Sequence, residues 1–148
     1  MDLKENLLSE MKGALKGRES LKLGTIRSLI SEIKNQEIDL RRELDNDEIV
    51  SIVFTQIKKR KEAATLFAKG GRNDLCEKEN QEMTILQKYL PKQVSEESLR
   101  NRIQEVIVEL EIVEMKDLGK VMKKIIPEFK GRADNGKIKN LVAECLES

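Results

Sequence analysis

The chain has 148 residues, of which 37% are charged, 39% are apolar and 3% are aromatic, and its net charge at neutral pH is +1. It contains no histidine, which excludes a histidine general base, a Ser-His-Asp triad and a His-ligated metal site. No apolar run is long enough to span a membrane, so the composition predicts a helix-rich protein that faces water.

Apolar residues recur at helical spacing through the first half of the chain. A first stripe runs from Leu3 to Leu15 and ends at Gly17, and a second runs from Ile26 to Leu44. Asp45 and Glu48 then have the spacing of a capping box, in which each side chain accepts a hydrogen bond from the other residue's backbone N–H. We therefore expect a third helix to begin there.

The same spacing continues up to Pro91. Gly70-Gly71 is expected to end the third helix, because glycine accepts the left-handed conformation found at helix C-termini. Asp74 and Glu77 repeat the capping spacing ahead of a fourth stripe, which Pro91 ends.

Three shorter helices are expected after Pro91. Ser95 is a hydroxyl N-cap for a stripe over residues 99–110, Pro127 stops a second stripe over 118–126, and a third covers 138–146. The sequence predicts an all-α protein. Its expected parts are an N-terminal domain of long helices (1–91), a linker (92–95) and a small C-terminal three-helix domain (96–148).

Charge is unevenly distributed in the C-terminal domain. Residues 96–114 hold two basic and six acidic side chains, whereas residues 116–139 hold eight basic and three acidic ones. The basic half has two interpretations: a face that contacts nucleic-acid phosphates, or a solvated face that pairs with the acidic helix. Phe129 is the only aromatic residue in the basic half, which argues against stacking on single strands. A second basic run, residues 58–61, covers a full helical turn and is interpreted as a solvated helix.

No self-contained active site is visible. Cys76 and Cys145 are too few for a structural zinc site, and we expect no metal or cofactor. The segment 131–136 places Arg132 and several backbone amides at the start of the last helix, which suits an anion. A plain turn between helices, capped by Asp134 or Asn135, explains the same residues. The N-terminus lacks the features of a signal or transit peptide, so we expect a cytoplasmic protein.

In the C-terminal domain, Leu118-Gly119-Lys120-Val121-Met122 is followed by Gly131-Arg132-Ala133-Asp134 and an amphipathic helix. This pattern resembles the tail domain of the GatB subunit of glutamine-dependent aminoacyl-tRNA amidotransferases. The rest of the chain resembles the stand-alone YqeY family in these motifs: Thr25-Ile26-Arg27, Ile57-Lys58-Lys59-Arg60, Gly71-Arg72-Asn73-Asp74-Leu75 and Leu86-Gln87-Lys88-Tyr89-Leu90-Pro91. The sequence is thus identified as similar to the GatB/YqeY family.

The resemblance implies a tail domain that engages tRNA, and a family label of carbon-nitrogen ligase with glutamine as amido-N-donor. It implies phosphate contacts at Lys130 and Arg132, and the charge pattern adds Lys120, Lys123, Lys124 and Lys137. Gly119 would allow close helix packing, Met122 would fill the core, and Gly131 and Ala133 would form the turn. The chain lacks the kinase-like catalytic domain of GatB and the serine-lysine machinery of the amidase subunit.

Three functions remain open at this point. The first is a module that binds tRNA or another structured RNA without an active site of its own. The second is an accessory subunit that works only with amidotransferase partners. The third is a helical protein–protein adaptor whose basic face is merely solvated. The sequence leaves the oligomeric state open.

Overall fold

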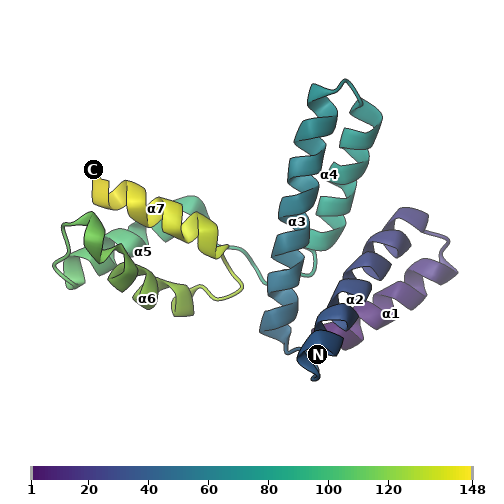
Figure 1. Cartoon of the computed structure of the whole chain (residues 1–148), viewed down its shortest axis with the longest axis horizontal. Coiled ribbons are helices and arrows are strands. Elements are labelled where there is room, and N and C mark those ends of the chain that lie inside the picture. The colour runs from purple at the N-terminus through teal and green to yellow at the C-terminus, as the bar shows by residue number, and fades with distance from the viewer. Residues whose placement is uncertain (1, 148) are drawn as a thin grey trace. The chain divides into compact units, whose positions relative to one another are not determined.

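A computed structural model describes residues 2–147 (Figure 1). Within that range the chain forms seven α-helices and one short 3-10 helix, and it contains no β-strand. The predicted all-α fold is confirmed. None of the helices in residues 2–147 is both long and apolar enough to cross a bilayer.

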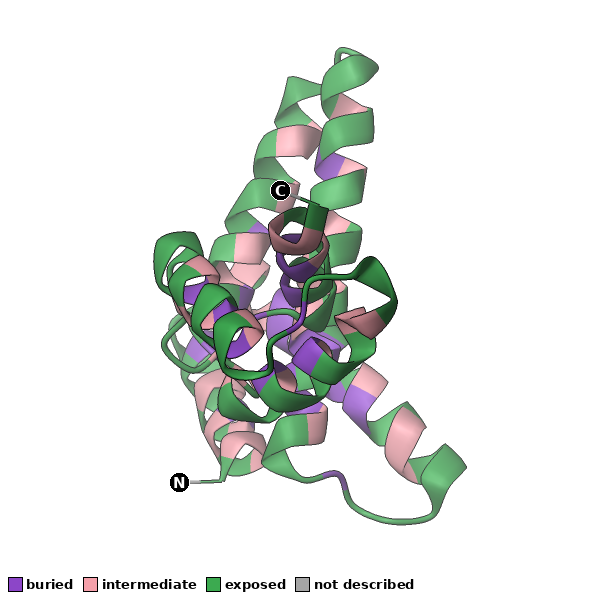
Figure 2. Cartoon of the chain, turned by 90° about the vertical axis from the view of Figure 1, so that its left-hand side faces the viewer, coloured by how far each residue is buried: buried purple, intermediate pink, exposed green. Residues whose placement is uncertain are grey.

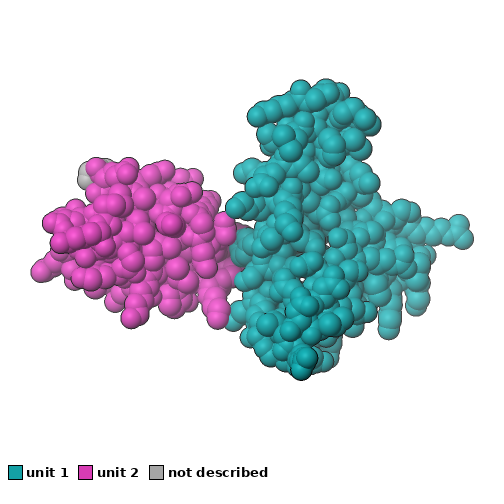
Figure 3. Space-filling model, viewed as in Figure 1, with its two compact units in different colours: residues 1–90 teal, residues 91–148 magenta. Residues whose placement is uncertain are grey.

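The chain divides after Leu90 into two compact units (Figure 3). We call residues 1–90 the N-terminal unit and residues 91–148 the C-terminal unit. Each has a hydrophobic core of its own. Each α-helix contributes a few buried positions, and most of the helical surface is exposed (Figure 2).

The N-terminal unit consists of two helical hairpins. Helices α1 (Leu3–Lys16) and α2 (Ser20–Leu40) form the first, and α3 (Asn46–Lys69) and α4 (Asn73–Gln87) form the second (Figure 1). All four helices contribute fully buried side chains, which include Leu7, Ile26, Leu29, Ile33, Ile49, Val53 and Leu86. This core holds the two hairpins together.

The capping box at the start of α3 is confirmed. The backbone N–H of Glu48 donates to Asp45 Oδ1 at 2.8 Å, and the backbone N–H of Asp45 donates to Glu48 Oε1 at 3.2 Å. The end of α3 is confirmed too, because Gly71 has a φ of +76° and reverses the chain there.

Two other helix boundaries differ from the prediction. Helix α2 ends at Leu40 because Arg41 adopts a left-handed conformation, so Leu44 is buried from a loop instead of from the helix. Helix α4 begins at Asn73, so the predicted cap at Asp74 is wrong. Asp74 lies in the first turn of α4 and forms an ion pair with Arg72 at 3.2 Å.

The C-terminal unit contains α5 (Glu96–Glu109), a 3-10 helix (Met115–Asp117), α6 (Leu118–Glu128) and α7 (Asn135–Glu147). Its fully buried side chains include Leu99, Ile103, Val121, Ile125 and Ile138. The predicted N-cap is confirmed, because Ser95 Oγ accepts the backbone N–H of Ser98 at 3.1 Å. Pro127 lies inside α6, which continues to Glu128, so the predicted stop before that proline is wrong.

Candidate functional site

Helix α6 presents three of the predicted RNA contacts on one exposed face. Lys120, Lys123 and Lys124 lie opposite the buried Val121 and Ile125, and at about 100° per residue they span about 100° of the helix. They border a hollow of about 480 Å³ that is completed by Leu110, Glu111, Ile112 and Asp117. We call Lys120, Lys123 and Lys124 the lysine face.

The lysine face is only weakly neutralised by the chain itself. Lys120 Nζ lies 3.3 Å from Asp117 Oδ1, and Lys124 Nζ lies 3.7 Å from Glu109 Oε2. Both lysine side chains are solvent-exposed, and ion pairs of such side chains contribute little and are screened by salt. Lys123 forms no ion pair within residues 2–147. An incoming phosphate therefore meets little internal competition.

The other three predicted contacts lie outside the hollow. Lys130 and Arg132 belong to the turn between α6 and α7, and Lys137 lies in the first turn of α7. The side chains of Arg132 and Lys137 are exposed and form no ion pair with any other residue that the structure describes. The six predicted contacts thus divide between the lysine face and this second segment.

The turn before α7 is tied into the C-terminal unit by its own backbone. The carbonyl oxygen of Phe129 accepts the N–H groups of Arg132 (2.8 Å) and Ala133 (3.2 Å), and the carbonyl oxygen of Arg132 accepts the N–H of Val94 (3.0 Å). Gln93 Nε2 donates to the carbonyl oxygen of Gly131 at 3.0 Å. Two amides that the sequence offered to an anion are therefore already used, and Arg132 has only its side chain for that role.

The four motif residues have different environments. Ala133 is buried in the core of the C-terminal unit and Met122 packs against it. Gly131 has a φ of +76°, which glycine adopts without strain. A Cβ atom added at Gly119 would meet no heavy atom within 4 Å, so the close helix packing expected at Gly119 is wrong.

The acidic helix α5 pairs mainly with its own arginines. The guanidinium of Arg102 donates to both carboxylate oxygens of Glu128 at 2.9 and 2.8 Å, and to Glu105 and Glu109 at 3.0 and 3.2 Å. The hydrogen bond from Arg102 is the main cause that lowers the pKa of Glu128. Within the lysine face, as the structure describes it, only Lys124 pairs with α5. Pairing with the acidic helix therefore neutralises little of the lysine face.

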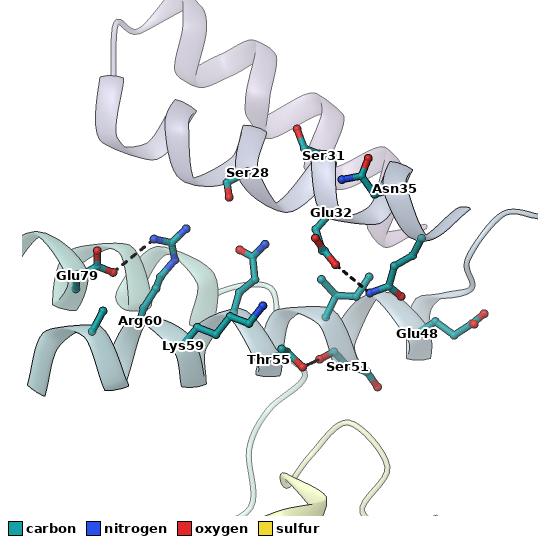
Figure 4. Close-up of a pocket in the computed structure, with 14 residues that line it drawn as sticks. Ser28, Ser31, Glu32, Asn35, Glu48, Ser51, Thr55, Lys59, Arg60 and Glu79 are labelled. Carbon is teal, nitrogen blue, oxygen red and sulfur yellow. Dashed lines mark hydrogen bonds and ion pairs between the residues drawn. The ribbon is translucent and has the colours of Figure 1, made fainter. Parts of the chain in front are cut away.

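A larger cleft lies in the N-terminal unit, between α2 and α3, and the sequence did not predict it. Its volume is about 850 Å³. Figure 4 shows Ser28, Ser31 and Asn35 of α2 on one side and Ser51, Thr55 and Lys59 of α3 on the other. Polar residues recur there at helical spacing on both helices, which is the signal in the sequence that could have indicated the cleft.

Arg60, at one end of this cleft, contradicts the prediction that residues 58–61 are all solvated. Its side chain is only 18% exposed, and its guanidinium pairs with Glu82 and, at 3.6 Å, with Glu79 of α4. Arg60 Nε is buried and has no hydrogen-bond partner. Lys58, Lys59 and Lys61 are exposed, as predicted. Among residues 2–147, no three acidic or cysteine side chains come together in a way that could hold a metal ion.

Similarity to known proteins covers almost the whole chain. The family model described as "Yqey-like protein" matches residues 4–146. The mitochondrial "Altered inheritance of mitochondria protein 41" of Eremothecium gossypii is 38% identical over 90 residues, which is 60% of this chain and 49% of that protein. Its counterpart in Kluyveromyces lactis is 34% identical over 108 residues, which is 70% of this chain and 58% of that protein.

The chain spans about half the length of the curated relatives it matches. These relatives are named as mitochondrial proteins, and this contradicts the expectation of a cytoplasmic location. The family itself is established by the model match, which extends through all seven helices and both units. The chain belongs to the YqeY-like family.

Proposed function

We propose that the chain is an RNA-binding module without an active site of its own. In this proposal it holds the phosphate backbone of a structured RNA through the lysine face, Arg132 and Lys137. The proposal depends most on three exposed cations that form no ion pair with any described residue: Lys123, which borders the hollow with Lys120 and Lys124, and Arg132 and Lys137 of the second segment. Backbone contacts of this kind supply affinity and position, and they read no base sequence.

The resemblance of the C-terminal unit to the GatB tail favours tRNA as the RNA. It also relates the chain to tRNA-dependent amidotransferases, whose label is carbon-nitrogen ligase with glutamine as amido-N-donor. If the chain acts as an accessory subunit, activity should appear only when amidotransferase partners are added. Arg132→Ala should then lower that activity together with tRNA binding.

The test is fluorescence-anisotropy titration of labelled tRNA at about 150 mM salt. Wild type is expected to bind in the micromolar range, which is typical of backbone contacts. The double variant Lys123→Ala/Arg132→Ala should lose about tenfold in affinity, because two phosphate contacts disappear. Lys12→Ala/Arg18→Ala removes the same charge from exposed positions of the N-terminal unit and should bind like wild type. Equal losses of affinity in both double variants would show that binding depends on net charge alone and not on Lys123 and Arg132.

A helical protein–protein adaptor is the second candidate, and one observation favours it. Val108 and Val113 are 76% and 83% exposed, and Leu110 and Met115 on the same segment are also exposed. Apolar side chains gathered in this way are typical of protein contact surfaces. If wild type does not bind tRNA, and Val108→Ser/Val113→Ser abolishes a protein complex while Lys123→Ala does not, the adaptor function is supported.

A further inference from the structure

We propose that the cleft between α2 and α3 binds an organic cation that carries several N–H donors, either the ammonium group of a polyamine or a guanidinium group. This site lies in the N-terminal unit and is independent of RNA binding by the lysine face. Its volume of about 850 Å³ is in the range of small-molecule sites. The part of α3 that lines it, from Glu48 to Ala63, is about 22 Å long, which suits a linear ligand.

The charges of the cleft favour a cation. Its lining includes three carboxylates and two basic side chains. Arg60 is occupied by Glu79 and the buried Glu82, and Glu48 is occupied by two hydrogen bonds from Arg42 at 2.7 and 2.8 Å.

Glu32 is the one carboxylate of the cleft lining that has no arginine partner among the described residues. It is half-buried and projects from α2 (Figure 4). It accepts one hydrogen bond of 3.2 Å from Gln36 on the same helix and forms no ion pair within the described residues. A half-buried carboxylate with so few partners favours a cationic donor, because charge-assisted hydrogen bonds are the strong ones.

Two hydroxyl groups of α3 offer acceptor oxygens to the cleft. The hydroxyl of Ser51 donates to the carbonyl oxygen of Asp47 at 3.2 Å, and that of Thr55 donates to the carbonyl oxygen of Ser51 at 3.1 Å. Both oxygens keep lone pairs, since a hydroxyl has one proton and two acceptor positions. Gln56 also lines the cleft, and its Oε1 is buried without a hydrogen-bond partner. A ligand with several N–H groups can donate hydrogen bonds to the hydroxyl oxygens of Ser51 and Thr55, whereas a cation without N–H groups cannot.

Lys59 gives the proposal a distinctive consequence. It lines the same cleft, is exposed and forms no ion pair within residues 2–147. Its ammonium group is a like charge beside the proposed cation and opposes binding. Removal of Lys59 is therefore expected to strengthen the binding of a cation, which is the opposite of what an anion site would show.

The experiment is a titration of the full-length, ¹⁵N-labelled protein with spermidine, arginine amide or tetramethylammonium. Spermidine stands for a free polyamine, and arginine amide stands for a side chain of a partner protein. Tetramethylammonium carries the charge without any N–H. Amide shifts are expected in residues 28–36 and 51–60 with the first two probes and not with the third. Tighter binding of spermidine assigns the site to a polyamine, and tighter binding of arginine amide assigns it to a side chain.

Two variants and a control complete the test. Glu32→Gln should weaken binding about tenfold, because it removes the charge-assisted hydrogen bond. Lys59→Ala should tighten it about threefold. Glu62→Gln, an exposed glutamate of α3 outside the cleft lining, should leave it unchanged. Equal shifts with tetramethylammonium, no shifts with any probe, or unchanged binding in a folded Glu32→Gln variant would overturn the proposal.

Discussion

Glu111 ends helix α5 in a conformation that costs free energy. Its φ is +54°, its N–H donates to the carbonyl oxygen of Val108 at 3.1 Å, and the N–H of Ile112 donates to that of Ile107 at 3.1 Å. These two bonds form a Schellman motif, in which glycine usually takes the left-handed position. A residue with a Cβ costs about 1–2 kcal/mol in that position.

Replacement of Glu111 by glycine should therefore stabilise the C-terminal unit. The gain of about 1–2 kcal/mol is reduced by about 0.5–1 kcal/mol, because glycine makes the unfolded chain more flexible. The net gain is about 0.5–1 kcal/mol. For a unit of about 60 residues this corresponds to a rise in Tm of about 2–8 °C.

Thermal unfolding of the full-length protein, followed by calorimetry, measures this shift. The control is Glu111→Ala, which removes the same carboxylate beside the lysine face and keeps the Cβ in the left-handed position. Its Tm should stay at or below that of wild type. If Glu111→Ala stabilises as much as Glu111→Gly, the gain comes from the lost charge and the backbone argument is refuted.

Three further predictions concern stability. Ile125→Ala empties a fully buried position in the core of the C-terminal unit and should cost about 2–5 kcal/mol in urea unfolding; a cost below about 1 kcal/mol would contradict this core. Arg60→Met leaves Glu82 buried without its cation and should lower the free energy of unfolding by about 3 kcal/mol. Arg60→Met/Glu82→Leu should recover most of this loss, and a double variant no more stable than Arg60→Met would contradict the prediction. The hydrogen bond from Arg42 holds the pKa of Glu48 at about 2, below the ordinary value of 4.5. The folded state therefore gains stability from ionised Glu48 above about pH 4.5 and loses it as the pH falls towards 2, so the urea midpoint of Glu48→Gln should fall less over that range than that of wild type.

Local features of the fold were predictable where one residue type has one clear role. Ser95 and the Asp45–Glu48 pair cap helices as expected, because side-chain oxygens at these spacings meet orphan N–H groups. The end of α2 was not predictable in this way. Arg41 takes a left-handed conformation that its residue type does not favour, so the buried Leu44 looked like a continuation of the helix.

The candidate sites were predictable only in part. The charge pattern identified Lys120, Lys123 and Lys124, since three lysines within five helical positions share a face. The charge pattern could not show that Arg60 is largely buried and paired with Glu79 and Glu82. These glutamates lie on α4 and contact Arg60 only because α3 packs against α4. The cleft depends in the same way on how far α2 and α3 separate, which helical periodicity does not determine.

If the basic residues of the C-terminal unit contact RNA phosphates, the affinity for tRNA should fall steeply as the salt concentration rises. On a plot of log affinity against log salt concentration, each contact contributes a slope of about −0.7 to −0.9. We expect Lys123→Ala/Arg132→Ala to make the slope less steep by about 1.4–1.8, and Lys12→Ala/Arg18→Ala to leave it unchanged. The same slope in wild type and in Lys123→Ala/Arg132→Ala would show that these two side chains make no phosphate contact.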